Sequence, residues 1–156
     1  MAISRWKVTT AFVQASSGRL IQEASRWLNL VSDAVNAAAQ QIGTVALATQ
    51  GAAVTTTTIP APVLSTGLYR VSYSLRITRA ATVSSSATLT LGWTSNGVAC
   101  TQAGAAVTGN TTSTQQNGVL VIAADVSTVV TYAVAYASAG ATSMQWALDV
   151  RLEACP

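Results

Sequence analysis

The chain has 156 residues, of which 50% are hydrophobic and only 8% are charged, and its formal net charge at pH 7 is +3. Because roughly a quarter of the residues in a typical soluble domain are charged, this chain has few charges to keep its copies apart. The length fits one domain plus an extension. The low charge favours a surface that other subunits or a larger particle cover. The alternative is a threonine-rich β-domain that tolerates few charges.

The composition also excludes several classes of function. The basic residues are scattered, which argues against a nucleic-acid-binding groove. No run of about 18 uninterrupted apolar residues is present, so we expect no membrane span. The N-terminus lacks the apolar core of a signal peptide. We therefore expect assembly in the cytosol, with Cys100 and Cys155 reduced.

The sequence contains little that supports catalysis. The absence of histidine excludes Ser–His and Cys–His dyads, and two cysteines alone do not make a zinc site. Asp149 and Glu153 lie four residues apart on a predicted strand, with their Cβ atoms about 13 Å apart, too far for a glycosidase pair. We expect these carboxylates to pair with arginines of another strand, namely Arg70, Arg76 or Arg79. No catalytic residue, metal site or cofactor is predicted.

Residues 1–16 form a predicted N-terminal arm. Within Ser4–Gln14, the side chains of Trp6, Val8 and Phe12 share one face of a β-like alternation. This segment either adds a strand to the main sheet of its own domain or docks on the sheet edge of another protein. Its position ahead of a helix favours an arm that attaches the protein through Trp6, Val8 and Phe12.

Residues 17–45 form a predicted helical stem that Gly43 ends. Apolar residues recur at alternating spacings of three and four, which defines a coiled-coil-like heptad seam. The seam consists of Ile21, Ala24, Leu28, Val31, Val35, Ala38 and Ile42. β-Branched residues at both core positions favour three strands, although a helix packed on its own β-domain would show the same spacing. About three and a half heptads are too few to hold three chains alone, so we expect the following domain to trimerise as well.

Residues 46–66 form a predicted linker with a first strand, in which Thr55–Thr58 favours extension and Pro60 and Pro62 stop it. Residues 67–156 form a predicted head domain, because alternating segments are separated by turn signals roughly every ten residues. Asn96–Gly97 is a strong hairpin signal, and Asp125 is a turn residue. About seven or eight strands in this length indicate an antiparallel β-sandwich, specifically a jelly roll.

Two strands of the head domain each have two interpretations. Val119–Ile122 is apolar on both faces, as in a strand buried at the centre of a sheet or a strand whose second face meets a neighbouring subunit. Tyr132 and Tyr136 lie on one side of their strand and invite the same two explanations. Core packing is the default for each, and strands that line a trimer axis are the sharper hypothesis.

Three polar loops are expected to gather at the ends of the sandwich. Their threonine, asparagine and glutamine side chains suit a sugar or a host surface, but they include no aromatic platform. The loops are Ser84–Ser86, Gly109–Asn117 and Ser138–Ser143.

Two blocks of the sequence resemble the C-terminal domain of tailed-bacteriophage virion proteins. They are GLYRVSYSLRITRAATVSSSATLTLGWTSNGVACTQAGAAVTGN, from Gly67, and TYAVAYASAGATSMQWALDVRLEA, which ends at Ala154. Trp146 stands where tyrosine is more usual in the pattern. The resemblance implies a trimeric fibre, head-fibre or decoration protein with a tumour-necrosis-factor-like or related jelly-roll domain and no enzymatic residues. It does not extend to the N-terminal 60 residues.

The sequence therefore predicts a mainly β protein with an N-terminal helix, assembled as a homotrimer. We expect a non-enzymatic structural component of a bacteriophage virion, either a head fibre or a capsid decoration protein, assembled in the host cytoplasm. The alternatives are a tail-fibre or tail-adaptor component and a tip that binds a host receptor or surface glycan. The expected partners are copies of this chain and capsid or tail proteins, contacted through the N-terminus, with no nucleic acid and no membrane.

Overall fold

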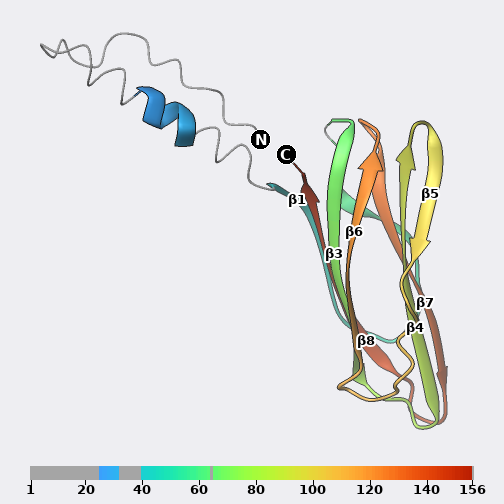
Figure 1. The fold of residues 1–156 in the computed structure, drawn as a ribbon. Helices are drawn as coiled ribbons and strands as arrows, with labels where there is room; N and C mark the ends of the chain where they lie inside the picture. The colour runs from blue at the N-terminus through green and yellow to red at the C-terminus, as the bar shows by residue number, and fades with distance from the viewer. Residues whose placement is uncertain (1–24, 32–39, 64, 156) are drawn as a thin grey trace, which may run out of the picture. The chain divides into compact units, whose positions relative to one another are not determined.

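A computed structural model describes residues 25–31, 40–63 and 65–155 of the chain (Figure 1). Residues 25–31 form a short helix, and Gln40–Cys155 form a compact unit of their own. Eight strands make up this unit: β1 (Gln40–Gln50), β2 (Val54–Pro62), β3 (Gly67–Arg79), β4 (Ser84–Ser95), β5 (Val98–Ala103), β6 (Gln115–Ala124), β7 (Val129–Ala139) and β8 (Gln145–Ala154).

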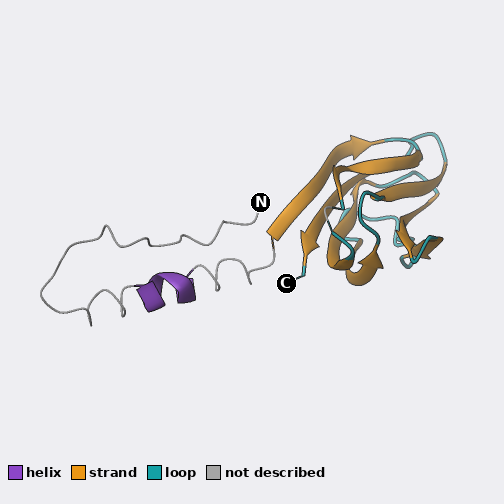
Figure 2. Ribbon diagram, turned by 90° about the horizontal axis from the view of Figure 1, so that it is seen from above, coloured by secondary structure: helices purple, strands orange, loops and turns teal. Residues whose placement is uncertain are grey.

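The strands form two four-stranded antiparallel sheets, in the orders β1-β8-β3-β6 and β2-β7-β4-β5. Figures 1 and 2 show the two sheets facing each other. The pairing is nested along the chain, because β1 pairs with β8, β2 with β7, β3 with β6 and β4 with β5. Two further ladders, β3 with β8 and β4 with β7, join these pairs into sheets. The prediction of a mainly β domain with two antiparallel sheets is confirmed.

The core lies between the sheets and follows from the two-residue alternation of the strands. In β8, four inward side chains are almost fully buried, while Asp149 and Arg151 point to solvent. The four are Trp146, Leu148, Val150 and Leu152. Burial of each such side chain stabilises the fold by about 1.5–3 kcal/mol. The indole Nε1 of Trp146 donates a hydrogen bond of 3.2 Å to the Ala52 carbonyl, which satisfies its only polar atom.

The hairpin predicted at Asn96–Gly97 is confirmed. Both residues have positive φ, 51° and 75°, as a two-residue turn between twisted strands requires, and Ser95 pairs with Val98 across it. Asp125, predicted as a turn residue, lies beyond β6 and closes this turn from outside. Its Oδ1 and Oδ2 accept hydrogen bonds from the amides of Asn96 and Gly97, at 2.9 and 2.8 Å.

The predicted end of the helical stem is wrong. The stem was expected to extend to Val45, with Ile42 in its seam, but Gln40–Gln50 is strand β1. Ile42 is half-buried against the core of the β-sandwich. Gly43, predicted to end the helix, lies within β1, where an added Cβ would come 3.0 Å from the side chains of Ile59 and Ala61. Pairing of β1 with β8 overrides the helical spacing, since the last part of the seam also fits a strand.

The β-domain consequently begins earlier than the predicted head domain of residues 67–156. Its first two strands occupy Gln40–Gln50 and most of the expected linker at 46–66. Pro60 lies within β2 and does not stop it, whereas the strand does end at Pro62. The strand tolerates both prolines because it lies at the edge of its sheet, where a missing amide hydrogen leaves no ladder bond unmade.

Core packing explains the two tyrosines of β7. Tyr132 is buried, and Tyr136 packs against the core while its hydroxyl donates a 3.0 Å hydrogen bond to the Met144 carbonyl. Both side chains are therefore accounted for within one β-domain.

Replacement of Gly140 should test the turn after β7. Gly140 has a φ of 110°, and an added Cβ would lie 2.7 Å from Thr82 Cβ and 3.0 Å from Val83 N. We expect Gly140→Ala to lower the free energy of unfolding by about 2 kcal/mol, measured by urea denaturation. Gly51→Ala is the matched control, because no atom lies within 4 Å of an added Cβ there, and its effect should stay within about 0.5 kcal/mol. Equal stability of the two variants would contradict the described turn.

Candidate interaction surface

The structure describes three of the seven residues of the predicted seam. Leu28 and Val31 lie in the helix at 25–31 with exposed fractions of 43% and 40%, whereas Ile42 belongs to β1. The remaining site residues lie outside the described part of the chain: Ile21, Ala24, Val35 and Ala38 of the seam, and Trp6, Val8 and Phe12 of the arm.

The helix at 25–31 exposes most of its apolar surface. Trp27 and Leu30 are exposed by 64% and 61%, in addition to the two seam residues. Large apolar side chains that are exposed together on a helix are typical of a surface that packs against other parts of the chain or against a partner. Within the described residues, no helix is long and apolar enough to span a bilayer.

Charge in the β-domain is confined to one sheet and one loop residue. The strands β2, β4, β5 and β7 contain no charged residue, and the outer face of their sheet presents mainly alanine, threonine and serine side chains, together with Val129. The opposite sheet carries three arginines on β3 and three charged residues on β8. In order, these are Arg70, Arg76, Arg79, Asp149, Arg151 and Glu153.

One predicted ion pair is present on this charged sheet. Arg70 and Glu153 lie directly opposite each other in the β3–β8 ladder. Arg70 Nη2 lies 2.5 Å from Glu153 Oε2, and Arg70 Nε donates to the same oxygen at 2.7 Å. The expectation that a β8 carboxylate pairs with a β3 arginine is confirmed for these two residues. Glu153 therefore neutralises the charge of Arg70, which lies on β3 next to the edge strand of the sheet.

Strand β6 forms that edge, and from Val119 to its end it is apolar on both faces. It is not at the centre of its sheet, so the central-strand explanation of Val119–Ile122 is wrong. Ile122 is buried, but Val119 and Val121 are exposed by 65% and 56%. Leu68 on the neighbouring β3, at 55%, extends the same outward surface. We call Leu68, Val119 and Val121 the β6 patch.

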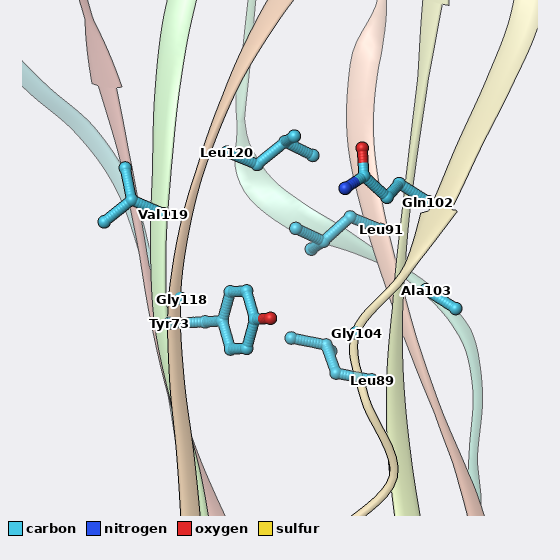
Figure 3. A pocket seen from close by; sticks show the side chains of 9 residues that line it. All are labelled: Tyr73, Leu89, Leu91, Gln102, Ala103, Gly104, Gly118, Val119 and Leu120. Atoms are coloured by element: carbon cyan, nitrogen blue, oxygen red, sulfur yellow. The ribbon is translucent and has the colours of Figure 1, made fainter.

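A small pocket lies between the sheets next to β6, with a volume of about 70 Å³ (Figure 3). The ring of Tyr73 extends into it towards Gly104, and leucines from both sheets line it. Gly118 leaves the space for the ring, since an added Cβ would lie 2.5 Å from it. The polar side chains in the lining are Tyr73 and Gln102. The pocket therefore holds no acid–base pair for catalysis.

The polar loops at one end of the sandwich hydrogen-bond to each other. Asn110 Oδ1 accepts from the Ala81 amide and from the Ser85 hydroxyl, each at 2.8 Å, while its Nδ2 donates to the Ala81 carbonyl at 3.1 Å. Thr82 Oγ1 accepts a bond of 2.9 Å from the Thr142 amide. Residues of the predicted loops do gather at one end, but Ser84–Ser86 begins β4, Gln115–Asn117 begins β6 and Ser138 lies in β7, so these stretches are strand and not loop. The polar groups named above already have partners within the domain.

The cysteines and acidic residues offer no alternative centre. Cys100 and Cys155 are free and half-buried, as expected for reduced thiols. Within the described residues, no three His, Cys, Asp or Glu side chains are close enough together to hold a metal ion.

No protein-family model matches this chain, and a search of the curated proteins finds no match either.

Of the β6 patch, sequence reasoning identified the β6 residues but missed Leu68. Leu68 shares the strand parity of Arg70 and Ser72, so the alternation of β3 alone places it on the polar, outward face. A leucine on this otherwise polar face was the feature of the sequence that could have indicated an exposed apolar surface.

A double-mutant cycle should show that the ion pair between Arg70 and Glu153 contributes little to the free energy of unfolding. The exposed fractions of their side chains are 45% and 18%. We expect a coupling of about 0.2–1 kcal/mol between Arg70→Gln and Glu153→Gln in urea denaturation, decreasing with added salt. A coupling of several kcal/mol that is insensitive to salt would contradict this description of a solvent-exposed pair.

Proposed function

We propose that this chain is a non-enzymatic structural protein of a bacteriophage virion, a homotrimeric head fibre or capsid decoration protein. The observation that carries the proposal is the charge-free sheet β2-β7-β4-β5. A face of mostly small, uncharged side chains packs closely on another protein surface without desolvating a charge. Such a face suits a subunit of a large assembly better than a freely diffusing domain.

The fold supports the same proposal. Nested pairing of eight strands in two sheets is the pattern of a jelly roll, a fold that occurs in viral capsid domains. The two sequence blocks that resemble phage virion proteins cover β3 to β5 and β7 to β8 of this domain. Since a fold alone does not define a function, the charge distribution has to carry the argument.

Trimerisation would begin in the N-terminal segment. The exposed seam residues Leu28 and Val31 support a helix that is covered by identical helices. With the β-domain now beginning at Gln40, the stem is limited to residues 17–39, shorter than the sequence alone suggested. The proposed arm, through Trp6, Val8 and Phe12, would attach this trimer to a capsid protein.

The alternatives place the trimer on the tail, as a fibre or adaptor component, or make it a tip that binds a host receptor or glycan. Glycan binding has less support, because the amide of Asn110 and the hydroxyls of Thr82 and Ser85 are engaged within the domain. Sugar sites also use aromatic platforms, and these loops contain none.

A charge placed in the seam should dissociate the trimer. Light scattering on the purified full chain should give a mass of at least three chains, and Val31→Asp with Val35→Asp should reduce it, since each helix would then bury two unpaired carboxylates. Asn29→Asp with Asn36→Asp is the matched control, because it adds the same two charges to the predicted stem outside the seam. A stable monomeric wild type, or a double variant that assembles normally, would overturn the proposed stem.

The location on the particle has its own test. A virion reconstruction at side-chain resolution should show this β-domain on the capsid shell. Density on the tail would favour the fibre or adaptor alternative. Absence of the chain from purified virions would overturn the proposed function.

A further inference from the structure

The four edge strands of the sandwich differ in how they are protected against pairing. Natural proteins protect edges with bulges, prolines, charges or short strands. The β1 ladder has two register shifts, the β2 ladder has two shifts and two prolines, and β5 has only six residues. By contrast, β6 has ten residues, no proline and no charge, and it pairs with β3 along its full length without a register shift. It is the one edge with none of these protections.

The backbone of β6 is oriented for pairing on its open side. The Ile77 amide donates a 3.0 Å hydrogen bond to the Thr114 carbonyl at the start of this ladder. In an antiparallel pair, only every second residue bonds to the neighbouring strand. Counting from Thr114, the residues between the bonded ones include Val119 and Val121. Their N–H and C=O groups therefore face the open edge.

The side chains of β6 suit an apolar, uncharged partner strand. Val119 and Val121 are exposed on the outer face, whereas Leu120 and Ile122 point to the core. The nearest charge is Arg70, opposite Val121 on β3, and Glu153 neutralises it. A second strand with the same composition would meet no like charge and would place apolar side chains beside those of β6 on both faces.

We propose that β6 pairs antiparallel with β6 of a second copy of this chain, which joins two four-stranded sheets into one eight-stranded sheet. Leu120 opposite the partner's Leu120 gives a register in which Val119 faces the partner's Val121. The same register sets Gly118, which has no side chain, opposite the larger Ile122 of the partner subunit. All backbone groups at the centre of the edge are then paired, and Val119 and Val121 of the β6 patch lie beside the valines of the partner strand.

The contact is separate from the proposed stem. An antiparallel pair of identical strands has two-fold symmetry, whereas a three-helix stem has three-fold symmetry. The β6 pair therefore links β-domains that belong to different stems. It depends on neither the proposed virion role nor the seam, so its test is distinct from theirs.

The test compares the full-length wild type with Val121→Lys by sedimentation equilibrium over a wide range of concentration. We expect the average mass of the wild type to rise with concentration. In Val121→Lys, which adds a lysine to the edge strand of each copy beside Arg70, the association should weaken at least about tenfold, because edge lysines oppose strand pairing. Val83→Lys is the matched control: Val83 is 68% exposed and lies outside β6, so this variant should associate like the wild type.

Two results would overturn the proposal. One is the same mass for wild type and Val121→Lys at every concentration. The other is dissociation of the smallest assembly by Val121→Lys, which would place β6 on the stem axis instead of at a two-fold contact.

Amide hydrogen exchange on the wild type gives a readout that does not depend on any variant. The amides of Val119 and Val121 should exchange more slowly as concentration rises, because they bond only across the new contact. The amides of Leu120 and Ile122 already face β3 and should change little. Exchange at Val119 and Val121 that is independent of concentration while the mass grows would show that the copies associate through another surface.

Discussion

The β-domain depends on the central ladder between β3 and β8. Strand β8 lies between β1 and β3, so the last strand of the chain holds the first strand in the sheet. Its inward side chains, from Trp146 to Leu152, fill the space between the sheets. Trp146 also donates a hydrogen bond to the carbonyl of Ala52 in the β1–β2 connection. Because these contacts join residues about a hundred positions apart, the sheet closes only when both ends of the domain are in place.

The nested order of the ladders explains how local turn chemistry contributes to so non-local a fold. The innermost pair, β4 and β5, is a two-residue hairpin whose turn is held by Asp125 from the β6–β7 connection. That carboxylate links the most local pairing to the loop that returns the chain to the other sheet. Each wider pair, β3–β6, β2–β7 and β1–β8, encloses the previous one in the sequence.

The sequence predicted the structural features that depend on residues close together in the chain. It did not predict the features that depend on pairing with a strand far away in the sequence. The alternation in β3, β4 and β8, the Asn96–Gly97 turn and the Arg70–Glu153 pair follow from period and register. Strand β1 was missed because residues up to Ile42 also fit a heptad, and only β8 makes them a strand. For the candidate surface, the sequence showed that Val119–Ile122 is apolar on both faces. It could not show that β6 lies at an edge, since the position of a strand in its sheet depends on non-local pairing.

The uneven charge of the two sheets bears on how such a protein would assemble. Each sheet offers a neutral route to contact: the charge-free face of β2-β7-β4-β5, and the β6 edge where Glu153 cancels Arg70. With little electrostatic repulsion to limit association, specificity has to come from geometry, through strand register at an edge and helix packing in a stem. A three-fold stem and a two-fold edge differ in symmetry, so neither contact can saturate the other. Together they would link one trimer to another, whereas the stem alone would give a trimer and the β6 edge alone a dimer.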